Sequence, residues 1–506
     1  MVITRRLVGA LLGVLAFAGC SSGGGGGGGG SGPTINSFTA TPTSLPAGGG
    51  SVTLAWNVTG ATSLSIDQSV GSVTPVTTGS TSANVTATTT FTLTATDSSG
   101  NSTMTAQVSV ASGPATITVS GTVIDEYGAL AAGETVLITS GTFSQSAVSN
   151  ATGGFSVASV PTPYNATVLD SGGAIAVQYQ GLTRADPSLV DVLTLAQPRT
   201  SNLAGGFTGG TYPEPDATYS TQMVFASPQT DLESSTSLSV PSLGSTYSGS
   251  VNWVGAATTT GAIYALEIHS SGAGLPLDFP GYGTLSNVLL EDMGSLTGQN
   301  VALGPVTTGT LSGTITPPAG YSVTAKDLYL VTAPAVVLEV VFDNSAPASF
   351  SYTAPNIADT SLTLLSNITG AGGSTVSTTT GLTATSSGVA INPLAPPILS
   401  LPVASAAGVT VTTQFSWTNF TGVYLVIFKP TSGPVYYVFT TATSTTIPDL
   451  TSVGLPLPAA TAYTWQILGF SAEATVDAVA VPGGIIGLEL ADGSIGESLT
   501  RDFTTQ

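Results

Sequence analysis

Apolar and polar residues alternate along most of this chain in short runs, and Gly, Asn, Asp and Pro separate these runs. In the stretch SVTLAWNV, the apolar residues Val52, Leu54, Trp56 and Val58 all fall on one face of a strand, because side chains alternate between the two faces. Long amphipathic helical patterns are absent from the sequence. The pattern predicts an all-β chain of tandem β-sandwich domains.

The first predicted domain spans residues 33–112. Its second half reads as a hairpin in which Phe91, Leu93 and Ala95 point inward and residues 97–101 form the turn. The stretches LPAGGGSVTLAWNVTGATSLSID and TTTFTLTATDSSGN resemble immunoglobulin-like repeats of bacterial surface proteins. We expect Trp56 to fill the space between the two sheets. Because the immunoglobulin cysteine pair is missing, packing alone must hold these sheets together.

Residues 115–197 form the second predicted domain. ITVSGTVIDEYGALAAGETVLI reads as strand, turn and strand, with Asp125 to Gly128 in the loop, and SNATGGFSVASVPTPYNATV follows. This order is similar to that of carboxypeptidase-regulatory-like domains, which have a transthyretin-like sandwich. The resemblance implies a structural or interaction module that carries no catalytic residues.

Residues 199–394 contain two stretches that look alike, YSGSVNW and LSGTITPPAG. Each is followed by a strongly apolar strand, AIYALEIHS in the first case and KDLYLVTAPAVVLEVVFD in the second. This duplication predicts two further β-sandwiches of unassigned family, at residues 199–307 and 308–394.

The last predicted domain covers residues 395–506. TTQFSWTNF supplies an early strand with Trp417 expected in the core, and GVYLVIFKP and PVYYVFTT form the next pair of strands. LPAATAYTWQILGF places Tyr463 and Trp465 just after a Leu-Pro turn. The arrangement resembles the fibronectin type III pattern. That resemblance implies that Tyr463 closes a corner by hydrogen-bonding back to the chain.

The amino-terminal segment reads as a secretory signal. Arg5 and Arg6 precede an apolar run from Leu7 to Gly19, which is too short to span a bilayer core of about 30 Å. The residues FAGC, ending at Cys20, resemble the lipobox of bacterial lipoproteins, although Leu is usual where this chain has Phe17. The resemblance implies that residues 1–19 are removed and that Cys20 carries a lipid. The alternative is an ordinary signal peptide with a chance cysteine.

A glycine-rich linker follows at residues 20–32, and such a tract is a flexible coil. Cys20 is the only cysteine, so an intramolecular disulfide is impossible. Ser21, in place of Asp, resembles lipoproteins exported to the outer membrane. The expected location is therefore the outer membrane or cell surface, with lipid as the membrane partner and the folded part outside the cytoplasm.

Charge narrows the range of partners. Charged residues make up 7% of the chain, against about 25% in an average globular protein. After Cys20 there are five basic and 27 acidic residues, a net charge of −22. A protein that binds nucleic acid needs clustered Lys and Arg, and so does a protein that docks electrostatically on anionic lipid. The sequence therefore argues against both.

His269 is the only histidine, so it is the first candidate for chemistry. In AIYALEIHS, Glu267 and His269 share one strand face, which is either an acid–base or metal site or simply the solvent-facing side of the strand. A zinc site needs three or four ligands, and a serine triad would rest wholly on His269. We expect no catalytic residue, no cofactor and no resident metal site.

Two weaker possibilities concern acidic and aromatic residues. Calcium takes six to eight oxygen ligands, and three acidic pairs near turns are candidates for it, although such residues usually cap turns: Asp125 with Glu126, Glu214 with Asp216, and Glu291 with Asp292. Four aromatic residues are candidates for stacking on sugars, with core packing as the alternative: Phe279, Tyr282, Tyr436 and Tyr437.

These observations favour a non-enzymatic, multidomain surface lipoprotein that acts as a spacer and as a binding or adhesion module for a protein or glycan ligand. The first alternative is an accessory carbohydrate-binding protein. A hydrolase within residues 199–394 is a third possibility. Because sandwiches host many functions, the fold alone cannot choose among them.

Overall fold

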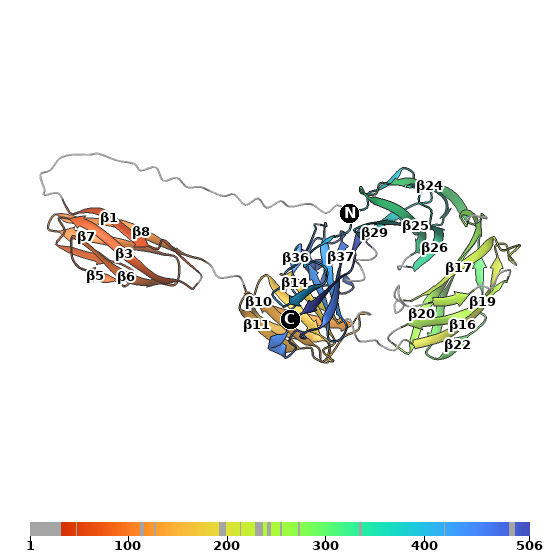
Figure 1. The fold of residues 1–506 in the computed structure, drawn as a ribbon, viewed down its shortest axis with the longest axis horizontal. Helices are drawn as coiled ribbons and strands as arrows, with labels where there is room; N and C mark the ends of the chain where they lie inside the picture. Colours follow the sequence, from red (N-terminus) through yellow and green to blue (C-terminus); the bar gives the residue numbers. More distant parts are fainter. Residues whose placement is uncertain are drawn as a thin grey trace. The chain divides into compact units, whose positions relative to one another are not determined.

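The computed structural model describes residues 32–506 except 47, 112–115, 126–127, 192–198, 213, 228–235, 240–243, 254–255, 272–273, 333–335, 419 and 485–490. The chain divides into two compact units, one ending at Pro114 and the other running from Ala115 to Gln506 (Figure 1). Both units are built from β-strands, which confirms the predicted fold class of tandem β-sandwiches.

The first unit is a sandwich of a three-stranded and a five-stranded sheet. The three-stranded sheet has the order β1 (Thr34–Thr41), β3 (Gly50–Thr59), β6 (Thr78–Val85). The five-stranded sheet has the order β2 (Ser44–Leu45), β8 (Gly100–Val110), β7 (Thr89–Asp97), β4 (Ser63–Ile66), β5 (Gly71–Val73).

Strict alternation builds the core of this unit. The inward residues predicted on β3 and β7 are all buried, which confirms the strand phase: Val52, Leu54, Trp56, Val58, Phe91, Leu93 and Ala95. The indole Nε1 of Trp56 donates a hydrogen bond of 3.0 Å to the carbonyl of Pro75. Gly79 lies directly on the ring, since a Cβ there would come within 2.7 Å of Trp56 Cζ2. A larger residue at position 79 would therefore push the tryptophan out of place.

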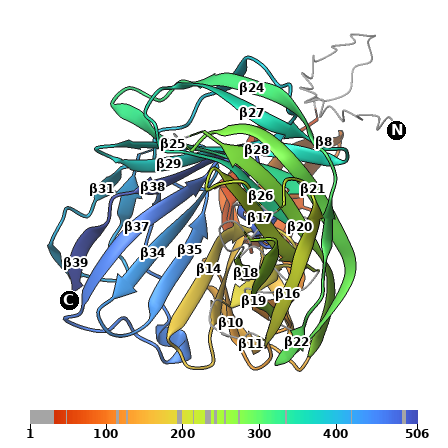
Figure 2. The same cartoon turned by 90° about the vertical axis from the view of Figure 1, so that its right-hand side faces the viewer.

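The second unit is organised around one sheet of 14 strands (Figure 2). Its path is β11 (Phe143–Val148), β10 (Thr135–Ser140), β13 (Tyr164–Leu169), β14 (Ile175–Leu182), β35 (Val435–Thr440), β34 (Val423–Pro430), β37 (Ala462–Phe470), β38 (Gly493–Ser498), β29 (Gly373–Leu382), β28 (Thr360–Gly370), β25 (Tyr321–Thr332), β26 (Val336–Asp343). Off this path, β39 (Arg501–Thr505) pairs with β37, and β32 (Ala406–Val409) pairs with β39.

Smaller sheets complete the second unit. Four of them have three strands each, in the orders β12 (Gly154–Pro161), β9 (Thr116–Asp125), β15 (Ser188–Asp191); β17 (Tyr219–Ala226), β20 (Thr258–Ser270), β21 (Pro276–Glu291); β27 (Ser349–Asn356), β24 (Thr307–Ile315), β30 (Val389–Ile391); and β31 (Leu399–Leu401), β33 (Phe415–Trp417), β36 (Ser444–Thr445). The fifth sheet has the order β18 (Thr236–Ser239), β19 (Thr246–Trp253), β16 (Arg199–Gly209), β22 (Gly294–Leu296). A further strand of this sheet, β23 (Val301–Leu303), also pairs with β16. Two short helical turns are α1 (Val476–Val479) and η1 (Thr451–Val453).

Backbone pairing joins parts of the second unit that lie far apart in the sequence. β14 and β35 pair in parallel, with Tyr179 opposite Phe439. β29 and β38 pair antiparallel, with Val376 opposite Ile495. Residues 115–197, 308–394 and 395–506 therefore contribute to a single hydrogen-bonded sheet.

Segments that lie far apart in the sequence also share hydrophobic cores. One core combines Val119, Phe155 and Tyr179 with residues from β34 to α1, among them Val423 and Val479. Another combines Leu266, Ile268 and Phe279 with apolar residues between Leu311 and Ile391. Apolar burial thus links these segments in addition to the strand pairing.

Two sequence-based expectations were wrong here. The stretch 326–343 was expected to be one strand, but it contributes to two antiparallel strands, β25 and β26. Lys326 lies opposite Asp343 in this pair. On β20, the face that carries Glu267 does not face solvent, because Glu267 is fully buried. Ile263 and Ala265 on the Glu267 face pack into one core, whereas Leu266 and Ile268 pack into another. The strand is therefore covered on both sides, which alternation of apolar and polar residues does not predict.

Candidate functional site

The expected lipidation site, Cys20, lies outside the described residues, as does the linker up to residue 31. In the part of the chain that is described, no helix has the length and apolar character needed to cross a bilayer. Lipidation of Cys20 therefore stays a prediction.

His269 lies at the end of β20 beside an acidic and an aromatic residue. Its Nδ1 is 3.2 Å from Oδ2 of Asp278, and the ring of Tyr219 stacks on it with a centroid distance of 4.3 Å. Asp216 is near enough for His269 to contribute to the lowered pKa of that carboxyl, although hydrogen bonds from Thr218 are the larger cause. This arrangement orients the imidazole on a half-buried surface.

Two carboxylates are buried near the start of β17. Both oxygens of Glu267 accept from the backbone N–H of Thr211, at 3.3 and 3.1 Å, and the Thr211 hydroxyl also contacts this carboxylate. Glu214 accepts from Thr221 at 3.5 Å, and Thr221 in turn contacts the hydroxyl of Tyr212. Burial raises the pKa of the Tyr212 hydroxyl. Because Glu267 has no exposed surface, it is unavailable to a substrate in solution and serves the local fold.

The other acidic candidates hold loops together. Asp125 Oδ1 accepts from the backbone N–H of Ala129 at 2.8 Å, and Asp216 accepts from Thr218. Asp292 forms an ion pair of 2.6 Å with Arg199, which holds the pKa of Asp292 below its usual range. Within the described ranges, no group of three or more His, Cys, Asp or Glu side chains could hold a metal ion. Glu126 lies outside those ranges, so calcium at these loops stays a prediction.

The aromatic candidates for sugar stacking are mostly inside the protein. Phe279 and Tyr436 are 2% and 0% exposed, so the stacking interpretation is wrong for both. Tyr282 and Tyr437 are half-buried and pack against hydrophobic cores. Adjacent tyrosines on β35 point to opposite faces, as the sequence predicted, but neither is freely exposed.

The expected corner contact of Tyr463 is absent from the described part of the chain. Its hydroxyl is buried beside Tyr436 and makes no hydrogen bond to the backbone there, and burial raises the pKa of Tyr463 to about 12. Tyr424 closes a loop instead. Its hydroxyl donates to the carbonyl of Phe420 at 2.5 Å and accepts from the N–H of the same residue at 2.7 Å.

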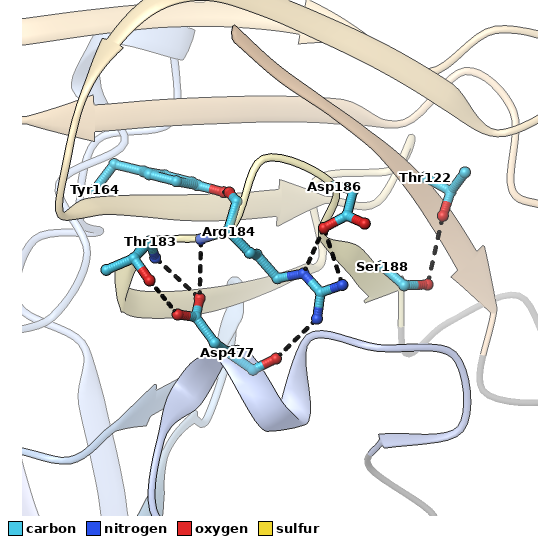
Figure 3. A network of polar contacts seen from close by, with 7 residues as sticks. All are labelled: Thr122, Tyr164, Thr183, Arg184, Asp186, Ser188 and Asp477. Carbon is cyan, nitrogen blue, oxygen red and sulfur yellow. Dashed lines mark hydrogen bonds and ion pairs between the residues drawn. The ribbon is translucent and has the colours of Figure 1, made fainter. Parts of the chain in front are cut away.

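A polar network locks two distant segments together (Figure 3). Oδ1 of Asp477, on α1, accepts from the N–H groups of Thr183 and Arg184 at 2.9 and 3.3 Å, and its Oδ2 accepts from the Thr183 hydroxyl at 2.5 Å. The Arg184 guanidinium donates to the carbonyl of Asp477 at 3.0 Å and forms an ion pair with Asp186. This network ties the loop after β14 to α1 across nearly 300 residues of sequence.

Glu134 is a further buried acid of the second unit. Glu134 is 6% exposed, and its Oε2 has no hydrogen-bond partner among the described residues. Burial, followed by the negative charges of Asp191 and Asp170, raises the pKa of Glu134 from its usual 4.5 to about 7. The sequence alone did not single out Glu134.

An open groove of about 400 Å³ lies where β14 and β35 end. Its lining combines Asn165, Gln180 and Gly181 with Gln414, residues 440–442 and residues 444–446. Sequence reasoning missed this groove, because these residues come together only through the pairing of strands that lie more than 250 residues apart.

Comparisons with known proteins give no family. No protein-family model matches the chain, and no curated protein matches it either. Among solved structures, the Bacillus anthracis TIE protein is similar at 11% identity over 71% of this chain and 73% of that chain, with a TM-score of 0.16. A tetra-tandem repeat from the extending region of a large adhesion protein is similar at 13% identity, over 94% of this chain and all of that one, with a TM-score of 0.15.

A three-domain I-band fragment of titin is similar at 12% identity over 54% of this chain and 98% of that chain, with a TM-score of 0.17. At scores this low, these similarities add nothing to the assignment of function. The functional argument therefore rests on the residues of the chain itself.

Proposed function

We propose that the protein is a non-enzymatic surface lipoprotein in which lipid on Cys20 provides the anchor and the folded units act as a spacer and binding module. The observation that carries this proposal is the continuous sheet from β11 to β26. Strand pairs joined by backbone hydrogen bonds resist separation far better than linkers do, so the second unit is suited to presenting a surface at a fixed geometry.

Two further observations support a role without catalysis. His269 and the acidic residues near it are used in stacking, ion pairs and turn hydrogen bonds. The carboxylate of Glu267, the acid closest in sequence to His269, has no exposed surface. A carboxylate mechanism in residues 199–394 would need two accessible acids flanking a cleft.

Carbohydrate binding is a second candidate role, and one observation favours it. The groove between β14 and β35 is lined by uncharged amide and hydroxyl side chains. Such groups suit a ligand that carries many hydroxyls and no charge.

The anchor is tested by fractionating cells of a two-membrane bacterium that express the wild-type chain, Cys20→Ser or the neighbouring control Ser22→Ala. We expect the wild type and Ser22→Ala in the membrane fraction and accessible to protease added outside intact cells. Cys20→Ser should appear in the soluble fraction. Equal membrane retention of Cys20→Ser would refute the anchor.

The absence of catalysis is tested on the purified full chain with esterase, peptidase and glycosidase substrates. We expect no turnover above buffer. Reproducible turnover that is lost in His269→Ala would assign a histidine-dependent enzyme. Turnover lost in Glu214→Gln would point to a carboxylate mechanism, and either result would overturn the proposal.

A further inference from the structure

We propose that the groove at the ends of β14 and β35 is a binding site for a neutral oligosaccharide. This inference rests on the second candidate role given above and names its site and ligand class. It is carried by three features of the groove: where the sheet places it, the chemistry of its lining, and the hydrogen bonds that hold one wall in position.

The topology places two strand ends side by side. β14 and β35 pair in parallel, and their last registered pair is Tyr179 with Phe439. Gln180 and Thr440 follow directly and both line the groove. Because parallel strands run in the same direction, their carboxyl ends and the loops after them meet at one edge.

The lining is polar and neutral. The described residues that form it are three side-chain amides, several hydroxyls, Gly181 and Ala442, and none of them is charged or aromatic. Amides supply both donors and acceptors, as do hydroxyls, so the groove can match the mixed donor and acceptor pattern of sugar hydroxyls. A volume of about 400 Å³ lies within the usual range for small-ligand sites.

One wall of the groove is fixed in position before any ligand binds. Gln180 Nε2 donates to Oε1 of Gln178 at 2.8 Å and to the hydroxyl of Thr445 at 2.9 Å. Asn165 Oδ1 accepts from the backbone N–H of Gly181 at 3.0 Å. Gln178, buried behind them, donates to Thr167. Side chains fixed in this way lose little freedom on binding, which favours affinity.

Other ligand classes fit the groove less well. An anionic ligand such as a phosphate would find no Lys or Arg in the described lining to neutralise it. An extended peptide usually adds to a free strand edge, yet both edges of β14 are already paired, with β13 and β35, and β36, which has an unpaired edge beside the groove, has only two residues. The uncharged polar lining therefore favours a neutral sugar chain over both.

The test uses the full chain carrying Cys20→Ser. Saturation-transfer difference NMR is recorded with cellohexaose, maltohexaose, xylohexaose and mannohexaose, and with two comparison ligands: an oligogalacturonate and an uncharged Ser/Thr-rich hexapeptide. We expect transfer to at least one neutral oligosaccharide and none to the comparison ligands. Gln414→Ala and Thr441→Val change exposed side chains of the lining, and each should weaken binding about five- to tenfold.

The matched controls are Gln107→Ala and Thr105→Val on β8, which are exposed and lie outside the groove. They should bind as tightly as the parent chain. The groove assignment is overturned if no neutral oligosaccharide binds, if the lining variants bind as well as their controls, or if the acidic sugar or the peptide binds instead. Because Cys20 is replaced throughout, none of these failures bears on the lipid anchor.

Discussion

Two tyrosines of the second unit, Tyr424 and Tyr463, differ in what their hydroxyl groups contact. Tyr424 forms hydrogen bonds with both the carbonyl and the N–H of Phe420, and both bonds are buried. Tyr463, on the neighbouring strand β37, packs its ring on Phe503 at a centroid distance of 5.3 Å and leaves its hydroxyl without a backbone partner in the described part of the chain. The two rings contribute apolar burial alike, but only one hydroxyl closes a loop.

We therefore expect Tyr424→Phe to lower the free energy of unfolding by about 1–3 kcal/mol, because the variant loses both hydrogen bonds to the buried carbonyl and N–H of Phe420. Tyr463→Phe should leave it unchanged or raise it, because this variant removes a buried hydroxyl that has no hydrogen-bond partner among the described residues. Chemical denaturation of both variants is the measurement. Equal losses in the two variants would show that Tyr463 also holds the backbone.

Glu134 makes stability depend on pH. Its pKa is higher in the folded chain, about 7, than its usual 4.5, so the folded state holds the proton more tightly. The resulting stabilisation is fully present below about pH 4.5 and is lost as the pH rises through 7. The melting temperature of the second unit should fall between pH 5 and pH 8.

Glu134→Gln, which mimics the protonated acid, should remove most of this dependence and should melt above the wild type at pH 8. Glu497→Gln, an exposed change on β38, is the control and should follow the wild type. If Glu134→Gln keeps the full pH dependence, another group is responsible. Thermal melts followed by circular dichroism at several pH values decide between these outcomes.

At the scale of single elements, α1 has only four residues and yet holds two distant parts of the chain together. Its Asp477 accepts three hydrogen bonds from Thr183 and Arg184, and the N–H of Ser188 donates to the carbonyl of Ala480 at 2.9 Å. Val476 and Val479 of the same turn lie in the core shared with β9, β14 and β15. Polar and apolar contacts therefore reinforce one another at this junction.

Asp477→Ala should cost about 2–4 kcal/mol, since it leaves backbone N–H groups without a charged acceptor. Asp186→Ala, which removes only the largely exposed partner of Arg184, should cost about 0–1 kcal/mol. Hydrogen exchange should quicken at β14, β15 and α1 in the first variant and stay unchanged in the second. An equally small effect in both would show that apolar packing alone holds the junction.

At the scale of the whole molecule, the structure predicts two cooperative unfolding events. The first unit has its own core, whereas one core of the second unit joins residues 119–189 with residues 423–480, and another joins residues 266–279 with residues 311–391. Trp56 lies in the former and Trp417 in the core that includes Tyr424 and Trp465. Elements that share a core and a sheet tend to unfold together.

Calorimetry of the full chain should therefore resolve two transitions. Trp56→Ala should lower only one of them and Trp417→Ala only the other, each by about 3–5 kcal/mol because both side chains are buried. Separate transitions for residues 115–197, 199–394 and 395–506 would contradict this expectation and would show that the shared cores contribute little to cooperativity.

The pattern of the sequence by itself determined the class of fold and which residues of many strands point inward. Alternation with period two assigns a face to each side chain, and this was sufficient for β3, β7 and the pair β34–β35. Alternation did not predict the burial of β20, because both faces of this strand are covered. It also did not predict that the apolar stretch 326–343 forms two paired strands.

What only the tertiary structure decided is which strands are neighbours. Alternation specifies the face of a strand but not its partner, because partner and register depend on contacts between residues that are hundreds of positions apart. The parallel pair of β14 with β35 and the pair of β29 with β38 have no local signal in the sequence. The groove at residues 165–181 and 414–446 and the network around Asp477 arise from the way those segments come together, so neither is visible until the chain is folded.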